Sequence, residues 1–379
     1  MKKQTNQNWI GVDIGTNYLR ACIRNDEVLD FIKVPSEGIQ AGDVINQEEF
    51  TIALTKLINK IKKNYNIKKI KLTIGISGTT LYSSSISIST SVNNKDSKVT
   101  EKETENIVDK NEQTYNTHNL STLYHLIKKY RLNGIEIKSS PLGMRGSRLE
   151  ARVFSVYSDS SQIKVISDIC KNLNIEIVDI LASPLVEANL VLDNKQKLSG
   201  IGLINIGYTH SSLVVFENYK PSIVNSLGFG TQDLDKELAL GLKVSLEEAY
   251  DIRHGDKLTG FNKKKYEDIV EKTLTSWATS VNNELEIIKR KELLPSGLIV
   301  LGEVSHMLRF ETIFKNKMHL PIKLDRYIID NLKDYNINNT EWLRPLGLAI
   351  IDNKDKAEYR KAINKFYDHI KDILCQFLP

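Results

Sequence analysis

The stretch WIGVDIGTNYLRACI, residues 9–23, decides how the rest of the chain is interpreted. Apolar residues alternate on both sides of a turn that contains Gly15 and Asn17, which predicts a β-hairpin. Such a turn suits a phosphate with its metal ion, because backbone N–H groups come close where no Cβ intrudes, the Thr16 hydroxyl donates and the Asp13 carboxylate holds a hydrated Mg²⁺. On this stretch alone, an ordinary hairpin with an acidic turn is the alternative.

Composition describes an ordinary globular protein. The chain has 379 residues, of which 41% are hydrophobic and 26% charged, which is enough for about two or three domains. The net charge of +5 is spread along the chain without a basic, aromatic patch, so we expect no nucleic-acid partner. Cys22, Cys170 and Cys375 form no CxxC pair, which favours a reducing cytoplasm. We expect no signal peptide and no membrane-spanning segment.

Helix and strand patterns follow in the order of an α/β layer. Strands are predicted at 28–35 and 69–77, with a helix at 50–65 between them. The same rhythm resumes in 161–192, where a strand lies between two helices. The apolar side of the 50–65 helix is expected to comprise Ile52, Leu54, Leu57, Ile58 and Ile61.

The character of the sequence changes between these two parts. Residues 83–92 are rich in serine, and residues 123–132 and 148–157 alternate like strands. Thr100 and Glu103 form the T-x-x-E pattern of a capping box at the start of a short helix. The sequence therefore predicts a small insert of strands and one helix.

Residues 197–216 repeat the opening theme as strand, Gly/Thr/Ser turn and strand, which indicates a duplicated architecture. Next, Gly228 and Gly230 lead directly into a helix, where free N–H groups and the helix dipole predict an anion site. A long helix at 266–290, a buried strand at 298–301 and a helix at 340–351 complete this part.

The last segment, residues 357–378, has the spacing of a helix with one apolar face. Lysines and aspartates occupy the other face. Two interpretations remain open: a terminal helix docked on the core, or an interfacial helix that lies on a membrane. The residues that would contact the membrane are Ile363, Phe366, Tyr367, Ile370, Ile373, Leu374, Phe377 and Leu378.

Residues 130–156, YRLNGIEIKSSPLGMRGSRLEARVFSV, resemble a motif of the FtsA family, P-x-G-M-x-G-x-R-L-E-x-x-V. Further similar segments are GVDIGTNYLRACI, EGIQAGDVIN, GISGTTLYSS, SPLVEANLVL and SLGFGTQDLDKELALGL. The resemblance to FtsA, an actin-like bacterial cell division protein of the actin/Hsp70/sugar-kinase superfamily, extends over residues 9–351. The matching motif residues are Pro141, Gly143, Met144, Gly146, Arg148, Leu149, Glu150 and Val153.

The resemblance implies an α/β, two-lobed actin-like fold with an FtsA-type α+β insert in the first lobe and a C-terminal amphipathic helix. The implied parts are a first lobe at 1–82 and 162–196, the insert at 83–161, a second lobe at 197–227 and 296–351, its small helical subdomain at 228–295, and a membrane-targeting helix at 357–379.

The implied function is an adaptor that tethers FtsZ filaments to the cytoplasmic membrane. The helical subdomain would bind the FtsZ C-terminal tail, the last helix would bind membrane lipids, and the insert would mediate self-association into filaments and contacts with later division proteins. The protein would then be peripheral, on the cytoplasmic side of the bacterial inner membrane at midcell. The alternatives are a pilus-assembly-type actin-like scaffold and an ATP-dependent enzyme of the same superfamily.

The implied cofactor is ATP with Mg²⁺, although hydrolysis is expected to be weak or absent. In the second loop, the family's D-I-G-G-G-T-T-D reads NIGYTHSS here, so Tyr208 crowds a triphosphate and the amide of Asn205 supplies no charge to a metal. Weak or absent ATP binding, with the lobes held by packing, and a retuned ATP pocket both remain open. His210 and His306 are expected at the surface rather than in catalysis. The implied cofactor-binding residues are Asp13, which would also hold Mg²⁺ through water, Gly15, Thr16, Asn17, Asn205, Gly207, Thr209, Gly228, Gly230 and Gly302.

Overall fold

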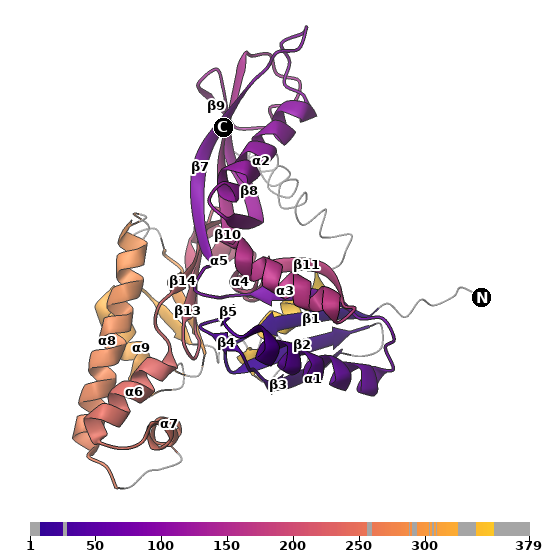
Figure 1. Ribbon diagram of the computed structural model, residues 1–379. Coiled ribbons are helices and arrows are strands. Elements are labelled where there is room, and N and C mark those ends of the chain that lie inside the picture. Colours follow the sequence, from indigo (N-terminus) through magenta and orange to yellow (C-terminus); the bar gives the residue numbers. More distant parts are fainter. Residues whose placement is uncertain are drawn as a thin grey trace.

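Three sheets organise the protein. The computed structural model describes residues 8–25, 29–255, 260–287, 289, 294–302, 304, 307, 309–324 and 339–351. Within these residues, two five-stranded sheets form two α/β lobes, and a four-stranded sheet stands out from them (Figure 1). The predicted C-terminal helix, with its membrane-contacting residues, lies outside the described residues. No described helix is long and apolar enough to cross a membrane.

The first lobe is built on the opening hairpin. Its sheet has the order β11-β6-β1-β2-β3, in which β1 pairs antiparallel with β2 and parallel with β6. The predicted hairpin is therefore confirmed, and Asp13 lies opposite Arg20 at its turn end. The strands are β1 (Trp9–Ile14), β2 (Tyr18–Arg24), β3 (Leu29–Pro35), β6 (Lys71–Ile76) and β11 (Glu176–Ala182), with a small β4 (Ile39–Gln40) and β5 (Asp43–Val44) pair beside them.

Two helices, α1 (Gln47–Tyr65) and α3 (Ser160–Asn172), pack on this lobe (Figure 1). Helix α1 begins where the Asn46 side chain accepts hydrogen bonds from the first N–H groups, and it buries a stripe at i, i+3 and i+4 spacing. Ile52 lies off that stripe and is 51% exposed, so its predicted place on the apolar side is wrong. The buried stripe comprises Phe50, Ala53, Leu54, Leu57, Ile58 and Ile61.

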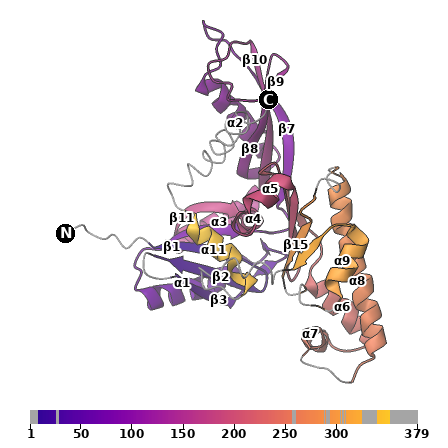
Figure 2. The ribbon, with the colours of Figure 1, turned by 180° about the vertical axis from the view of Figure 1, so that it is seen from behind.

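Helix α11 (Leu343–Ile350), preceded by a 3-10 turn at Thr340–Trp342, also belongs to the first lobe. It packs across β1, β2 and β6 beside α4 (Ser183–Val191) (Figure 2). Gly11 of β1 allows this close packing of α11, because a Cβ there would lie 2.4 Å from the Pro345 carbonyl oxygen. The assignment of all of 296–351 to the second lobe is corrected accordingly.

The insert is a four-stranded antiparallel sheet in the order β7-β10-β8-β9 (Figure 1). Helix α2 (Glu101–Asn116) packs on it and begins at the predicted capping box, which is confirmed. Ile107 of α2 is fully buried with Leu149 and Val153 in a separate small core. The strands are β7 (Tyr82–Ser91), β8 (Leu120–Leu132), β9 (Ile135–Ile137) and β10 (Arg148–Asp159).

The second lobe repeats the plan of the first. Its sheet has the order β14-β13-β12-β15-β16, with β12 antiparallel to β13 and parallel to β15. Residues 197–199, predicted as the start of a strand, instead end the short helix α5 (Asn194–Ser199), because Asp193 and Gln196 form a capping box there. The strands are β12 (Ile201–Ile206), β13 (Ser211–Glu217), β14 (Lys220–Leu227), β15 (Leu298–Leu301) and β16 (Ile322–Leu324).

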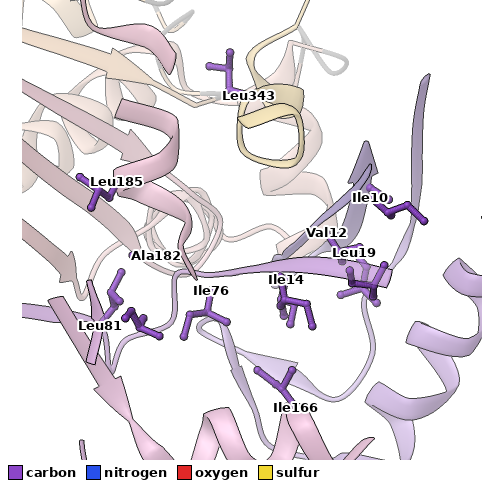
Figure 3. Packing of buried hydrophobic residues seen from close by; sticks show 14 of the residues in the cluster. Ile10, Val12, Ile14, Leu19, Ile76, Leu81, Ile166, Ala182, Leu185 and Leu343 are labelled. Atoms are coloured by element: carbon purple, nitrogen blue, oxygen red, sulfur yellow. The ribbon is translucent and has the colours of Figure 1, made fainter. Parts of the chain in front are cut away.

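Among the described residues, four helices accompany the second sheet: α6 (Thr231–Leu242), α7 (Leu246–His254), α8 (Lys263–Ile287) and α9 (Phe310–Met318). The apolar core does not stop at the boundary between the lobes. One buried cluster joins first-lobe residues such as Ile10 and Ile14 to Leu203 and Phe216 of the second sheet. Figure 3 shows part of this cluster, with Leu185 from α4 and Leu343 from α11. Burial therefore ties the two lobes together.

Candidate functional site

A cavity of about 260 Å³ lies where the two hairpins, β1–β2 and β12–β13, meet between the lobes. Seven of the ten predicted cofactor-binding residues line it: Asp13, Gly15, Thr16, Asn17, Asn205, Gly207 and Gly302. The other three, Thr209, Gly228 and Gly230, are not among the lining residues. Arg20 and Glu341 form an ion pair at this cavity, with 3.3 Å between Nε and Oε2.

The polar groups of the first hairpin are already bonded within the chain. Asp13, 3% exposed at the end of β1, accepts a hydrogen bond from the Ser183 hydroxyl at 2.6 Å. The Thr16 hydroxyl lies 2.9 Å from the Thr209 hydroxyl and accepts from the Gly42 N–H at 3.2 Å. The carboxylate and hydroxyl that the sequence offers to Mg²⁺ and phosphate therefore have protein partners.

A buried ion pair lies behind the second hairpin. Glu187 on α4 is fully buried, and Arg344 on α11 donates from Nε to its Oε2 at 3.0 Å. Asn205 donates from its amide to the other carboxylate oxygen at 2.7 Å, and Arg344 also donates to the Ser212 hydroxyl at 2.8 Å. Burial raises the pKa of Glu187, with Arg344 and Asn205 opposing the rise. A carboxylate this deep needs its partner to stay ionised.

Sequence reasoning missed both members of this pair. Each is the single charged residue of a mostly apolar helix, Glu187 in SPLVEANLV and Arg344 in LRPLGLAI. Charged side chains are rarely fully buried unless they are paired, so a lone acid and a lone base in two apolar helices were the available signal.

His210 is buried between the lobes, at 8% exposure, which corrects its expected place at the surface. Burial, and next the charge of Arg344, lower the pKa of His210 to about 4, so the ring is neutral at pH 7. Its Cε1 atom packs so closely that a Cβ on Gly42 would lie 2.9 Å away. Within the described part of the chain, Nδ1 makes no hydrogen bond. His306 lies outside the described residues.

The helix start predicted as an anion site is occupied by the chain itself. The N–H groups of Thr231 and Gln232 donate to the carbonyls of Gly207 and Tyr208 at 2.9 and 2.8 Å. The Gly230 N–H donates to the carboxylate of Asp233 at 3.0 Å. These are the first N–H groups of α6, so the second hairpin's backbone takes the place that an anion would have.

The residues present do not fit a Mg²⁺–triphosphate while they hold these contacts. Cavities that bind cofactors usually measure about 300–1,000 Å³, and this one is smaller. Mg²⁺ takes oxygen ligands, but both carboxylate oxygens of Glu187 are engaged by Asn205 and Arg344, and one oxygen of Asp13 already accepts from Ser183. Among the described residues, no cluster of three His, Cys, Asp or Glu side chains could hold a metal ion.

Comparison with known families identifies the insert. The model of the SHS2 domain inserted in FtsA matches residues 78–157. That range covers β7, α2, β8, β9 and most of β10, and it includes the motif residues on which the sequence resemblance was based.

Similarity to curated proteins extends beyond the insert. FtsA of Pseudomonas aeruginosa is 22% identical over 370 residues, which cover 90% of this chain and 88% of that protein. FtsA of Bacillus subtilis is 22% identical over 249 residues, 64% of this chain and 57% of that protein. FtsA of Neisseria meningitidis is also 22% identical, over 84% of this chain and 83% of that protein.

Solved structures show the fold. The PilM–PilN type IV pilus biogenesis complex aligns with a TM-score of 0.62 and 15% identity, over 91% of this chain and 98% of that one. MreB5 of Spiroplasma citri bound to ADP aligns with a TM-score of 0.53 and 12% identity, over 94% and 98%. The predicted fold class and the resemblance are thus confirmed: this is an actin-like chain that carries the SHS2 domain of FtsA and is similar over most of its length to FtsA cell division proteins.

Proposed function

We propose that this protein is an actin-like adaptor of bacterial cell division that tethers FtsZ filaments to the cytoplasmic membrane and recruits later division proteins. The observation that carries the proposal is the FtsA-type SHS2 domain at residues 78–157, inserted between β6 and α3 of an actin-like lobe. The curated relatives that match over most of the chain are named as cell division proteins. The match to the FtsA insert favours this role over that of a pilus-assembly scaffold.

The insert is suited to contacts with other proteins. It projects away from both lobes (Figure 1) and carries exposed apolar side chains, with Ile135 at 74% and Leu142 at 47% exposure. Exposed apolar residues on a projecting module are typical of interaction surfaces. We assign self-association into filaments, and contacts with later division proteins, to this module.

The helical subdomain is the proposed receptor for the FtsZ tail. Leu240 on α6 is 77% exposed, and Leu246 and Tyr250 on α7 are 41% and 39% exposed. The two helices are held together by the buried pair Arg253–Asp235, with 2.6 Å between Nε and Oδ1. Exposed apolar side chains on two helices that an ion pair holds together suit a short peptide whose apolar side chains they can bury.

Fluorescence anisotropy with a labelled FtsZ C-terminal tail peptide tests this assignment on the full chain. Leu240→Asp is expected to weaken binding by about tenfold or more, because it places a charge where apolar area would be buried. Ile135→Asp is the matched control, since it makes the same change at an equally exposed site on the insert, and it is expected to leave binding unchanged. Failure of the wild-type chain to bind the peptide would remove the central claim.

Membrane attachment is the second part of the proposal. We assign it to the amphipathic segment 357–379, which lies outside the described residues. A single amphipathic helix binds lipid reversibly, so stable attachment requires the avidity of a filament. Flotation with liposomes is expected for the full chain and not for a chain that ends at Ile351. Equal flotation of the two would exclude the segment as the tether.

The proposed role is that of a scaffold rather than a hydrolase. A general base has to reach the proton that it removes. Asp13 accepts from Ser183, Glu187 from Arg344 and Asn205, and Glu341 from Arg20, so each of the three described carboxylates that line the cavity is engaged within the chain while the contacts last. Nucleotide binding, which the ADP-bound structural neighbour suggests, has to compete with these contacts.

A further inference from the structure

We propose that the protein holds its own lobes together with an internal clasp, whose contacts engage side chains that a Mg²⁺-nucleotide would use between the lobes. The clasp is defined by three contacts: the Thr16–Thr209 hydroxyl pair, the Glu187–Arg344 ion pair with its partners, and the buried ring of His210. The inference does not depend on the division role and has its own test.

The hydroxyl pair joins the tips of the two hairpins directly. Thr16 and Thr209 are 193 residues apart in sequence, and their oxygen atoms are 2.9 Å apart. Thr16 also accepts the Gly42 N–H, so the first hairpin is held in place from its own lobe as well. The two hydroxyls at the hairpin tips thus bond each other across the cleft.

The hydrogen bonds around the ion pair join the two lobes. Arg344 of α11 and Glu187 of α4 both lie on the first lobe, and Arg344 donates to the Ser212 hydroxyl of β13 in the second lobe. Asn205 of β12 completes the network at the other oxygen of Glu187. Separating the lobes would leave buried charges without part of their hydrogen bonds, which is strongly unfavourable.

The third contact is the imidazole of His210. It extends from the second hairpin to the first lobe, where it packs against Gly42 and interacts with the backbone of Ser77. The ring is neutral at pH 7 and nearly fully buried, so moving the lobes apart would expose it. Its burial therefore favours the position in which the lobes are in contact.

The base of the insert ties the lobes at a second place. The Ser226 N–H of β14 donates to the Leu81 carbonyl at 3.0 Å. Ser83 at the start of β7 donates from its N–H to Asn225 Oδ1 at 2.9 Å and accepts from the Val224 N–H at 2.8 Å. Together with the apolar core shared by the lobes, this attachment restricts the rotation that would open the cleft.

Hydrogen–deuterium exchange on the full chain, with and without Mg²⁺-ATP, tests the clasp. We expect the wild-type turns at 13–18 and 205–212 to be protected without nucleotide and unchanged by about 1 mM Mg²⁺-ATP, a concentration that detects even weak binding. Arg344→Gln is expected to speed exchange in both turns by about tenfold or more. Arg253→Gln, which breaks an even more deeply buried ion pair inside the second lobe, is the matched control and is expected to leave the 13–18 turn unchanged.

A milder pair of substitutions covers the case in which Arg344→Gln unfolds the whole chain. The double variant Thr16→Val, Thr209→Val removes the two hydroxyls at almost constant side-chain volume. It is expected to speed exchange of the two turns several-fold and to leave exchange in the core of α1 unchanged. The clasp is refuted if the wild-type turns exchange rapidly without nucleotide and become protected on addition of Mg²⁺-ATP. It is also refuted if the double valine variant exchanges like the wild type.

Discussion

Gly11→Ala is the substitution whose effect follows most directly from the structure. The added Cβ would lie 2.4 Å from the Pro345 carbonyl oxygen and 2.5 Å from the Ala349 nitrogen. These two atoms belong to the same i, i+4 turn of α11, so the methyl group pushes against helix backbone rather than a movable side chain. Ordinary carbon contacts need about 3.5 Å or more, so α11 has to move outward by roughly 1 Å.

The helix has little room to move. Helix α11 also packs closely on α4, because a Cβ added at Gly347 would lie 2.6 Å from Val186 of α4. The helix is therefore held between α4 and β1. Overpacking of this kind costs about 1–3 kcal/mol, and we expect the upper end because the neighbours are backbone atoms. The free energy that holds α11 on the first lobe should fall by about 3 kcal/mol.

Urea titration followed by tryptophan fluorescence measures this effect. Trp342 stands at the start of α11 and packs on Phe31 of β3, with 5.1 Å between ring centroids, so it reports detachment of the helix. Gly228→Ala is the control, since no atom lies within 4 Å of its added Cβ, and it should change stability by less than about 0.5 kcal/mol. A midpoint for Gly11→Ala equal to that of the wild type would refute the close packing of α11 on β1.

Three further outcomes are expected. Asn46→Ala should destabilise the chain by about 1 kcal/mol in thermal unfolding, because it removes the acceptor that caps α1. His210, whose pKa is lowered to about 4 by burial and by Arg344, should stabilise the fold above pH 6.5 and lose this contribution as pH falls from 6.5 towards 4, measured as unfolding midpoints against pH. Hydrogen bonds from Thr100 lower the pKa of Glu103. The contribution of Glu103 to the stability of the fold should therefore be complete above pH 4.5 and be lost as the pH falls through the lowered pKa, measured by acid titration of the near-ultraviolet circular dichroism.

Each of these outcomes has a control. Asn46→Asp keeps a capping oxygen and should restore most of the stability, and equal loss in both variants would contradict the capping explanation. His210→Gln should flatten the pH dependence between 6.5 and 4, and an unchanged slope would show that other groups cause it. Glu103→Gln should likewise weaken the acid transition of the insert, and an identical transition would contradict the role assigned to the capping box.

Local patterns predicted most of the secondary structure correctly. Alternation around Asp13 and around Asn205 was sufficient for both hairpins, because the pleat of a strand places successive side chains on opposite faces. The capping box at Thr100 marked the start of α2 for the same local reason. The error at Ile52 shows the limit, since an apolar residue near a helical stripe was assigned to the core although its angle on α1 points it to solvent.

The sequence alone thus determined the two hairpins, the insert and the resemblance to FtsA, since each depends on residues close together in the chain. Only the tertiary structure decided how the cleft is occupied. Thr16 meets Thr209, and Glu187 meets Arg344, across 193 and 157 residues, and no local pattern records such distances. The opening hairpin offers a carboxylate and a hydroxyl that suit a nucleotide, but the fold brings other polar side chains within hydrogen-bond distance of both, and burial makes those bonds costly to break.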